Sequence, residues 1–582
     1  MENVNIKING IAVSAPKGST ILEAARLAHI EIPTLCFLKD INEIGACRVC
    51  VVEVKGARSL VASCVYPINE GMEVWTNTPK VMESRKKTVQ LLLSNHNRSC
   101  LSCVRSGHCE LQELAHDLGV EDEGYYDGAK TPSCIDDSAV HMIRDNSKCV
   151  LCRRCSAVCE QVQGIGVIGP NMRGFSTHIG SAFEMGLGET SCVSCGQCIA
   201  VCPTGALTEK TCINEVFAAL ADPKKHVVVQ TAPAVRAALG EEFGLPIGTN
   251  VEGKMAAALR RLGFDKVFDT DFSADLTIME EAHEFIDRVQ NGGVLPLITS
   301  CSPGWVKYCE HYFPDMTENL SSCKSPQQMF GAVLKSYYAE KAGIDPKDIV
   351  SVSVMPCTAK KFEIGRDGQA ANGVPDLDYT MTTRELARMI KKAGIRFLEL
   401  PDEKFDDPLG ISTGAGVIFG ATGGVMEAAL RTAVETLTGE ELPNVDFTEV
   451  RGTQGIKEAT YHVAGMDVKV AVASGLGNAR DLLNKVKSGE ASYHFIEIMG
   501  CPGGCVNGGG QPQQPGPIRN TTDIRALRAK VLYDSDKDNP IRKSHENPAI
   551  KELYDSYLGK PGSPLAHHLL HTTYVKREIN QH

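Results

Sequence analysis

Two runs of one pattern, Cys149-Val-Leu-Cys-Arg-Arg-Cys-Ser-Ala-Val-Cys159 and Cys192-Val-Ser-Cys-Gly-Gln-Cys-Ile-Ala-Val-Cys202, stand in the first half of this chain. Each run has the spacing Cys-x2-Cys-x2-Cys-x3-Cys, which is typical of bacterial domains that hold two 4Fe-4S clusters. In those domains the fourth cysteine of each run binds the cluster of the other run. The pattern therefore predicts a two-cluster domain over residues 139–212. One cluster would be held by Cys149, Cys152, Cys155 and Cys202, and the other by Cys192, Cys195, Cys198 and Cys159.

A second group of thiols lies near the N-terminus, before this bacterial ferredoxin-like domain. Residues 1–78 begin with two short alternating strands and a helical run at 21–27, which is typical of a ββα-type ferredoxin domain. Four thiols with the spacing Cys-x10-Cys-x2-Cys-x13-Cys suit a 2Fe-2S cluster, with a structural zinc site as the alternative. These thiols are Cys36, Cys47, Cys50 and Cys64.

Residues 79–138 carry a third group, in which one imidazole replaces a thiolate. The members of this group are His96, Cys100, Cys103 and Cys109. A Cys3His zinc site is chemically possible, but the position between two iron–sulfur domains favours a 4Fe-4S cluster. The first half of the chain is thus predicted to hold one 2Fe-2S and three accessory 4Fe-4S clusters. Such a row of centres moves single electrons.

The composition indicates a multidomain protein of a reducing compartment. Sixteen of the 23 cysteines precede residue 203, and closely grouped thiols without an export signal are better metal ligands than disulfide partners. We expect a cytoplasmic protein, and no membrane span because no apolar run of roughly eighteen residues occurs. The formal net charge of −11 disfavours nonspecific nucleic-acid binding and is compatible with docking of redox partners.

From residue 213 onward the pattern changes. Strand-like runs such as 226–230 and 349–355 alternate with amphipathic helical stretches, so 213–519 is predicted to be a large α/β domain. A basic, helix-rich segment over 520–582 ends in His567-His-Leu-Leu-His571, where a packed or solvated helix end is favoured over a metal site. The remaining thiols, interpreted as buried and structural, are Cys134, Cys212, Cys309 and Cys323.

One glycine motif needs a separate interpretation. The segment Gly164-Ile-Gly-Val-Ile-Gly169 satisfies G-x-G-x-x-G, but nicotinamide binding requires a preceding strand and a following helix. Cysteine ligands precede this segment, and Pro170 follows it at once. We therefore expect a turn between two cluster loops, and the sequence offers no credible flavin or NAD site.

Three motifs of the second half resemble the signature of the iron-only (FeFe) hydrogenases. They are Thr299-Ser-Cys-Ser-Pro-Gly-Trp305, Met355-Pro-Cys-Thr-Ala-Lys-Lys-Phe-Glu363 and Glu497-Ile-Met-Gly-Cys-Pro-Gly-Gly-Cys-Val-Asn-Gly-Gly-Gly-Gln-Pro512. From the residues alone, Cys501 and Cys505 flank a turn without bulky side chains, so two thiolates can approach a large inorganic cofactor. Cys357 follows an apolar strand, where α/β proteins commonly place active groups. The resemblance covers practically the entire chain, with 520–582 similar to a hydrogenase small subunit.

The resemblance implies an H-cluster, in which a 4Fe-4S cluster shares a cysteine thiolate with a di-iron unit carrying CO, cyanide and a bridging dithiolate amine. Cys505 matches the shared ligand, and Cys357 and Cys501 match other ligands. Lys360 matches the residue that hydrogen-bonds a cyanide. The residues that match those packing around the di-iron unit are Met355 and Met499.

The first motif departs from the family pattern. Many members carry two adjacent cysteines there, the first relaying protons and the second ligating the cubane, whereas this chain has Cys301-Ser302. Because serine would have to bind as an alkoxide at a site built of soft thiolates, we favour a cysteine ligand, Cys301 first. The alternatives are that Cys323 reaches the cluster, or that Ser302 ligates while Cys301 keeps the relay role.

The resemblance also implies a proton path. The segment 279–288 has helical periodicity that places Glu281, Glu284 and Arg288 on one face, which by itself is typical of a solvated, salt-bridged face. These three residues and Ser321 match the family's proton path.

The implied activity is an oxygen-sensitive, anaerobic hydrogenase that interconverts H2 with two protons and two electrons. The expected electron partner is ferredoxin, or flavin- and NAD(P)-binding subunits of a larger complex that is in some relatives electron-bifurcating. The single cysteine of the first motif and the histidine-rich tail favour the complex. Separate maturation proteins would insert the di-iron unit. A non-catalytic electron-transfer subunit or cluster-assembly protein is the competing class.

Overall fold

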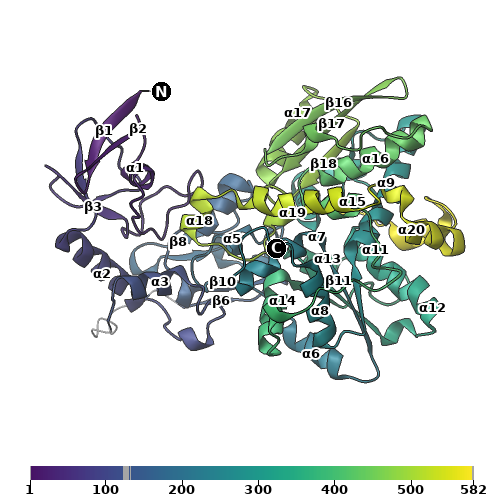
Figure 1. The fold of residues 1–582 in the computed structure, drawn as a ribbon, viewed down its shortest axis with the longest axis horizontal. Coiled ribbons are helices and arrows are strands. Elements are labelled where there is room, and N and C mark those ends of the chain that lie inside the picture. Colours follow the sequence, from purple (N-terminus) through teal and green to yellow (C-terminus); the bar gives the residue numbers. More distant parts are fainter. Residues whose placement is uncertain (1, 122–129, 131–132, 580–582) are drawn as a thin grey trace.

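The computed structural model describes residues 2–121, 130 and 133–579. Figure 1 shows a small N-terminal part at one end and a large body at the other, with the elements of the two cysteine runs between them. The C-terminal helices run along the large body, so segments far apart in sequence lie side by side (Figure 1). None of the described helices combines the length and the apolar character needed to cross a bilayer.

The N-terminal part has the predicted ββα order. Its five-stranded sheet has the order β2-β1-β5-β3-β4, and α1 (Ile21–Leu27) begins at Thr20, which forms a capping box with Glu23. Alternate side chains of β1 and β2 point inward, and Cys50 and Cys64 belong to the same small core. The strands are β1 (Asn3–Ile8), β2 (Ile11–Pro16), β3 (Val51–Val54), β4 (Val61–Ala62) and β5 (Glu73–Trp75).

The middle part carries the remaining accessory cysteines. Helices α2 (Pro79–Ser94) and α3 (Glu110–Asp117) flank the His96 group, and each ferredoxin-like run leads into a one-turn helix. These short helices are α4 (Arg154–Ala157) and α5 (Gln197–Ala200), and the strands are β6 (Ile135–Asp136), β7 (Met142–Asp145), β8 (Gly169–Asn171), β9 (His178–Gly180) and β10 (Leu207–Glu209). Gly164 and Gly166 have positive φ, and β8 begins at Gly169. The glycine motif is therefore a turn before a strand, as expected.

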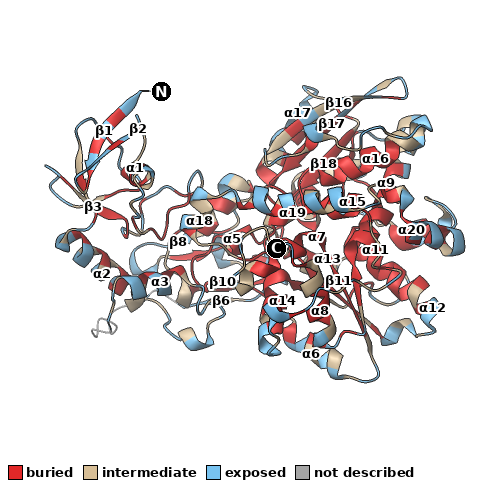
Figure 2. Cartoon of the chain, viewed as in Figure 1, coloured by how far each residue is buried: buried red, intermediate tan, exposed pale blue. Residues whose placement is uncertain are grey.

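The large body is built on two four-stranded sheets. In the order β12-β11-β14-β15 all strands are parallel, whereas in β13-β18-β17-β16 only β16 is antiparallel to its neighbour. Strands β11, β14 and β18 are almost wholly buried, as parallel strands covered on both faces are (Figure 2). The strands are β11 (His226–Thr231), β12 (Lys266–Asp269), β13 (Leu297–Ile298), β14 (Ile349–Met355), β15 (Tyr379–Thr382), β16 (Ile456–Val463), β17 (Met466–Ser474) and β18 (Phe495–Met499).

Helices cover both sheets, which confirms the predicted α/β class of this body. The helices before the last strand are α6 (Ile213–Ala221), α7 (Pro233–Arg236), α8 (Glu252–Leu262), α9 (Thr270–Asn291), α10 (Pro303–Tyr312), α11 (Pro326–Val333), α12 (Ala339–Ala342), α13 (Ala359–Glu363), α14 (Thr383–Lys392), α15 (Gly414–Val417), α16 (Gly424–Thr438) and α17 (Leu476–Ser488). The C-terminal segment adds α18 (Gly516–Thr521), α19 (Ile524–Asp538), α20 (Pro548–Leu553) and α21 (Pro564–Leu570), which confirms its predicted helical character.

A buried ion-pair network fixes this C-terminal segment to the large body. The Arg431 guanidinium on α16 donates to Glu427 at 2.7 Å and to both oxygens of Asp536 on α19 at 2.8 and 2.9 Å. None of the three side chains is more than 1% exposed. Each carboxylate has a second, partly exposed partner, since Arg451 pairs with Glu427 and Arg542 with Asp536, both at 2.6 Å. Removing the buried Arg431 would still leave these charges undercompensated in a medium that solvates them poorly.

We predict that Arg431→Met destabilises the large body by up to about 3 kcal/mol, because two buried carboxylates would lose the guanidinium that they share and keep only Arg451 and Arg542 as partners. Denaturant unfolding followed by circular dichroism measures the loss. Arg525→Met is the matched control, since its pair with Asp523 is 37% and 41% exposed and such pairs contribute at most about 1 kcal/mol. Equal losses in the two variants would contradict the prediction.

Candidate active site and cluster ligands

The three motif loops meet between the two sheets of the large body. Strand β14 of one sheet ends at Met355, two residues before Cys357, and β18 of the other ends at Met499, two residues before Cys501. Strand β13 leads in the same way into the loop with Cys301. Because parallel strands end at a common edge, the two sheets bring these loops to one place.

The thiols of Cys357, Cys501 and Cys505 form one buried group. Burial raises the pKa of all three thiols, and the nearby Cys357 and Cys505 raise that of Cys501 further. The following glycines let the backbone pack closely, since a Cβ added to Gly508 would lie 2.1 Å from the Pro356 carbonyl oxygen. Three soft thiols that are costly to ionise without a metal fit the ligand set of a cluster.

Cys301 and Ser302 face different surroundings. Besides burial, Glu281 and Cys505 raise the pKa of the Cys301 thiol, while Lys360 lowers it. The Ser302 hydroxyl accepts a hydrogen bond from the Gly500 N–H at 3.1 Å, directly before Cys501. Cys301 therefore lies near both Glu281 and Cys505, and Ser302 lies beside the Cys501 turn.

Lys360 is held by a polar cluster beside these thiols. Its ammonium donates to Ser325 Oγ at 2.7 Å, to Glu363 Oε2 at 2.9 Å and to the Cys301 carbonyl at 3.2 Å. Met355 and Met499 are 3% and 2% exposed, so they belong to the apolar lining. The sequence interpretation missed Glu363, although its i, i+3 spacing from Lys360 on a helix was a usable signal.

A second carboxylate also escaped the sequence interpretation. Glu497 is buried on β18 and accepts hydrogen bonds from the Gly423 and Met426 N–H groups at 2.6 and 2.7 Å. These donors lie at the N-terminus of α16, whose dipole favours an anion. Glu497 also contributes to the raised pKa of Cys301 and Cys505.

The predicted proton-path residues form a connected chain on α9 and the segment after α10. Arg288 donates to Glu284 at 2.6 Å, and the Ser321 hydroxyl donates to Glu284 at 2.9 Å. Ser321 also lies close enough to Glu281 to lower its pKa, and Glu281, when ionised, raises the pKa of Cys301. The face of α9 that carries these residues is buried at Glu281, which is 2% exposed. It is therefore not the solvated face that helical periodicity alone would suggest.

Cys323 does not join the thiols of the motif loops. Its Sγ lies 3.8 Å from Glu284 Oε2, and its N–H donates to Ser321 Oγ at 3.3 Å. Burial and the nearby carboxylates hold the pKa of this thiol well above its ordinary value. The structure thus brings Cys323 to Glu284 and Ser321, two residues of the predicted proton path, rather than to Cys357 and Cys501.

The accessory cysteines gather in the predicted groups. One small cavity is lined by Cys149, Cys152, Cys155 and Cys202, and another by Cys159, Cys192, Cys195 and Cys198. In the N-terminal group the Sγ atoms of Cys50 and Cys64 are 3.3 Å apart, and Cys36 hydrogen-bonds Cys47. Such convergence of four thiols at each place fits iron–sulfur ligation.

The His96 group also fits a metal centre. Burial lowers the pKa of His96 to about 4, and its Nδ1 is a buried atom without a hydrogen-bond partner among the described residues. Cys103 and Cys109 lie close enough for the first to raise the pKa of the second. Cys100, the remaining predicted ligand, lies in the turn that leads to Cys103. A neutral imidazole with an unused nitrogen can ligate a metal.

In space, the accessory ligand groups form a row that leads from the N-terminal part to the motif loops of the large body. The Asn42 amide joins two groups, donating to the Cys36 and Cys152 carbonyls at 2.7 and 2.9 Å. At the other end Cys195 raises the pKa of Cys501, and the Thr358 hydroxyl donates to the Ser194 carbonyl at 2.7 Å. The second ferredoxin-like run therefore packs directly on the predicted active site.

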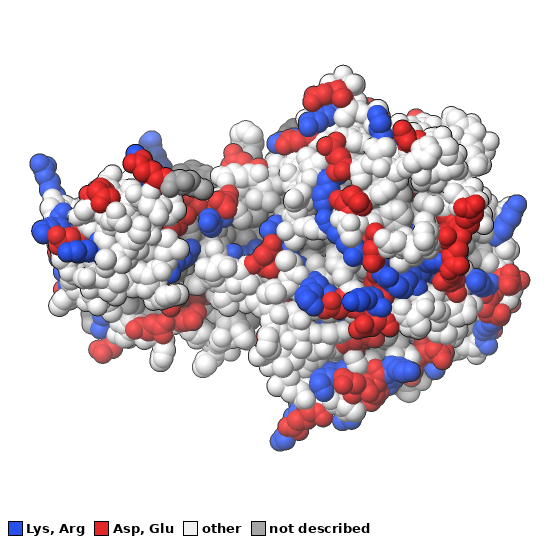
Figure 3. All heavy atoms as spheres, turned by 45° about the horizontal axis from the view of Figure 1, so that its top comes forward, with Lys and Arg blue, Asp and Glu red and all other residues white. Residues whose placement is uncertain are grey.

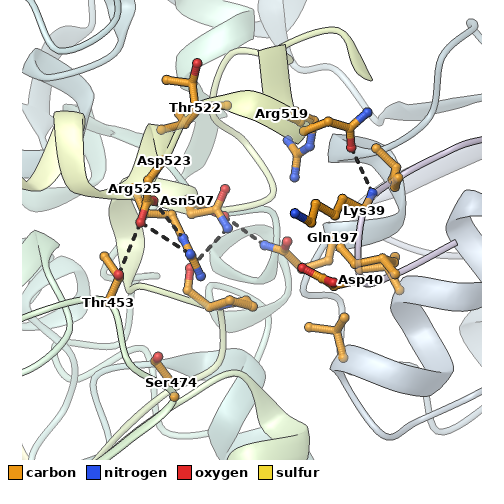
Figure 4. Close-up of a pocket in the computed structure, with 18 of the residues that line it drawn as sticks. Lys39, Asp40, Gln197, Thr453, Ser474, Asn507, Arg519, Thr522, Asp523 and Arg525 are labelled. Atoms are coloured by element: carbon orange, nitrogen blue, oxygen red, sulfur yellow. Dashed lines mark hydrogen bonds and ion pairs between the residues drawn. The ribbon is translucent and has the colours of Figure 1, made fainter. Parts of the chain in front are cut away.

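A cleft of about 640 Å³ opens where several parts of the chain meet (Figure 4). Its lining includes Lys39 from the N-terminal part, Gln197 from the second cysteine run, Pro502 from the Cys501 turn and Arg519 from α18. Among the described residues that line it there is no member of the predicted proton path. The cleft thus lies at the junction of the domains and not at the outer end of that path.

Family comparisons agree with this arrangement. Residues 225–509 match the model of the iron-only hydrogenase large subunit, C-terminal domain, and residues 522–577 that of the iron hydrogenase small subunit. Residues 1–79 match a 2Fe-2S iron–sulfur cluster binding domain. Residues 85–123 match the NADH-ubiquinone oxidoreductase-G iron–sulfur binding region, and residues 148–206 a 4Fe-4S dicluster domain.

Individual relatives extend the similarity over the entire chain. The NADP-reducing hydrogenase subunit HndD of Solidesulfovibrio fructosivorans is 53% identical over 99% of this chain and 100% of its own length. Iron hydrogenase 1 of Clostridium pasteurianum is 44% identical over 98% of this chain and 100% of its own. A solved apo variant of the FeFe-hydrogenase HydA1 from Chlamydomonas reinhardtii is 46% identical with a TM-score of 0.56, covering 63% of this chain and 99% of that one.

The chain belongs to the iron-only hydrogenase family. It is an enzyme with 2Fe-2S and 4Fe-4S binding domains in front of a hydrogenase catalytic domain. The predicted activity, reversible oxidation of H2 with electron transfer through accessory iron–sulfur clusters, is thereby confirmed.

We predict that Glu281 carries a proton at neutral pH. Burial, then the charge of Glu284, raises the pKa of Glu281 to about 8, so its carboxylic acid form persists until the pH rises through that value. Infrared difference spectra between the native protein and Glu281→Gln should show one protonated carboxyl band that is lost with a midpoint near this pH. In Glu284→Gln the midpoint should fall, because a neighbouring negative charge is gone. Loss of the band at the ordinary carboxyl pKa would contradict the prediction.

Proposed function

We propose that this chain is the catalytic subunit of an NAD(P)-linked or electron-bifurcating hydrogenase complex of the reducing cytoplasm. The observation that carries the proposal is the 53% identity, along the whole chain, to a protein named as an NADP-reducing hydrogenase subunit. In the described part of the chain the G-x-G-x-x-G segment is a turn before a strand, so a nicotinamide would need a flavin-bearing partner subunit. A stand-alone enzyme that uses ferredoxin is the second candidate, because the accessory clusters already deliver single electrons.

The surface charge does not select one class of electron partner. The formal net charge is −11, yet Figure 3 shows acidic and basic side chains interspersed on the face it presents, without a large region of one sign. Docking on that face would therefore depend on local shape and pairing more than on long-range steering.

We propose one 2Fe-2S cluster, three accessory 4Fe-4S clusters and the H-cluster as the cofactor set. The gathering of the predicted ligands in four separate groups supports the accessory count. The closeness of Cys195 to Cys501 supports electron transfer between the last accessory cluster and the catalytic centre. Because clusters of this kind exchange single electrons, two transfers accompany each H2.

At the active site the proposed roles follow from position. When bound, the H-cluster supplies the di-iron unit where H2 is split or formed, held by Cys357, Cys501 and Cys505 as its ligands. Lys360 offers an ammonium that Ser325 and Glu363 keep in place. Met355 and Met499 exclude water, which strengthens every electrostatic interaction there.

Protons are proposed to pass along Glu284, Ser321, Glu281 and Cys301. Arg288 orients Glu284 through the contact at 2.6 Å. Glu281 is the buried member, and its raised pKa lets it both hold and release a proton near neutral pH. The Cys301 thiol, whose pKa is also raised by burial, stays protonated until it passes its proton on.

Cys301 is better suited to this relay than to ligation, so we do not retain the preference that the sequence suggested for it. Ser302 has extended backbone angles, and consecutive side chains of an extended segment point to opposite sides. Cys301 lies close enough to Glu281 to exchange a proton with it, while Ser302 accepts a hydrogen bond from the Gly500 N–H, directly before Cys501. We propose Ser302 as the fourth cubane ligand, in the unusual form of an alkoxide.

We predict different signatures for the two residues. Cys301→Ala should keep the infrared bands of CO and cyanide but lose roughly 100-fold or more of H2 turnover, because a proton carrier is removed. Ser302→Cys should alter the electron paramagnetic resonance spectrum of the cubane and raise its reduction potential, since an alkoxide is the harder ligand and favours oxidised iron. Ser302→Ala is the control. An unchanged cubane spectrum in that variant would show that serine is no ligand.

We predict that anaerobic native purification yields this chain bound to a flavoprotein, because nicotinamide chemistry needs a carrier that converts two-electron into one-electron transfer. Size-exclusion chromatography with flavin and iron analysis measures the association. A monomer that reacts rapidly with ferredoxin alone would defeat the complex and favour the stand-alone enzyme.

A further inference from the structure

A group of metal-binding side chains lies at the outer end of the proposed proton path. Glu284, Cys323 and His571 each offer one donor atom, and these atoms all lie within 4.8 Å of one another. Cys323 is 1% exposed, and the side chains of Glu284 and His571 are 15% and 7% exposed. Nothing in the catalytic function described above uses Cys323 or His571.

The backbone holds these donors from two distant segments. Cys323 and His571 form an antiparallel β-bridge. On either side of the bridge, the Lys324 N–H donates to the Leu570 carbonyl at 2.7 Å, and the Thr572 N–H donates to the Ser322 carbonyl at 2.8 Å. The imidazole of His571, directly after α21, is packed, as expected for a histidine at a helix end. Its neighbours, however, are a thiol and carboxylates.

Hydrogen bonds orient the imidazole and link it to a further carboxylate. Its Nδ1 lies 2.8 Å from Ser322 Oγ, and its Nε2 lies 3.2 Å from Glu280 Oε2. Glu280 is itself buried and accepts hydrogen bonds from the Tyr554 hydroxyl at 2.5 Å and the Gly562 N–H at 2.9 Å. Ligation through one ring nitrogen would give up one of these two hydrogen bonds, and the other would fix the ring, as is usual at metal centres.

The local charge favours a cation. Glu284 and Glu280 act on Cys323 as negative neighbours, and Glu281 does so when it is ionised. Arg288 pairs with Glu284 and is 14% exposed, so it offsets only part of this potential. A divalent ion would be attracted to the thiol and would take up the negative charge that burial leaves there.

We propose that Glu284, Cys323 and His571 bind a divalent zinc-type cation. Thiolate, imidazole and carboxylate are the donors that Zn²⁺ takes, and three protein ligands leave a fourth position for water. Bonds of about 2.0–2.3 Å in a tetrahedral arrangement place donor atoms about 3.3–3.8 Å apart. Cys323 Sγ and Glu284 Oε2, 3.8 Å apart, already have this spacing, so only the imidazole must approach, by at most about 1 Å. Binding releases the Cys323 thiol proton to solvent.

Occupation of this site would close the proton path. The ion would take the Glu284 carboxylate, which accepts the hydrogen bonds of Ser321 and Arg288 in the metal-free arrangement. It would also place a positive charge where protons enter. This consequence rests on the proposed proton path, whereas the binding itself does not.

The test uses anaerobic holoenzyme of verified iron content with substoichiometric Zn²⁺. Equilibrium dialysis with metal analysis counts the bound ion, and zinc K-edge X-ray absorption identifies its ligands. We expect one zinc with one sulfur and otherwise nitrogen and oxygen neighbours. Cys323→Ser and His571→Ala should each weaken binding more than about 100-fold, since loss of an outer partner alone costs about 10–100-fold.

His545→Ala is the matched control, because Glu435, His545 and Glu546 form another group of similar donors that lacks a thiol. It should leave the sulfur-ligated zinc in place. Undiminished binding in Cys323→Ser, or zinc without a sulfur neighbour, would overturn the proposal. The rate of H2 evolution is measured with and without zinc for each variant. Zinc should lower this rate in the native enzyme and in His545→Ala, but not in Cys323→Ser or His571→Ala. Sulfur-ligated zinc without inhibition would leave the site standing and refute the path through Glu284.

Discussion

The burial of thiols that must become thiolates is the constraint on which the active site depends. Cys357, Cys501 and Cys505 lie where burial raises the pKa of each, so their anionic forms are costly unless a metal takes up the charge. Two sheets from different parts of the chain end at this place, and glycines let the loops approach closely. The cofactor thus belongs to the stability of the site as well as to its chemistry.

The proposed routes of electrons and protons reach this buried place from different elements. The second ferredoxin-like run packs on the Cys501 turn, while the carboxylates of α9 approach Cys301. The C-terminal segment contributes on the proton side through His571, at an antiparallel bridge to Cys323. Separate routes for electrons and protons have a physical advantage. The protein between the two routes can exclude water from the catalytic centre, while electrons arrive through the clusters and protons through side chains.

Much of this arrangement could be predicted from the sequence, because cluster ligands follow fixed spacing. The crossed grouping of the two runs is an example, since Cys202 lines the cavity of Cys149, Cys152 and Cys155. Contacts between distant segments carry no such local signal. His571 and Cys323 are 248 residues apart in number, and only the β-bridge brings them together. Burial was equally hidden, and helical periodicity alone would have left Glu281 in solvent.

The roles proposed for Cys301 and Ser302 are supported by how firmly hydrogen bonds hold the first motif. The Thr299 N–H donates to the Ile496 carbonyl at 3.0 Å, and the Trp305 indole donates to the Thr299 carbonyl at 3.1 Å. The Ser300 hydroxyl donates to the Cys323 carbonyl at 2.8 Å. A rotation that turned Cys301 towards Cys501 would have to break contacts of this kind on both sides of it. Because several buried hydrogen bonds would be lost together, such a shift of the loop is costly, which supports the proposed roles of Cys301 as relay and Ser302 as ligand.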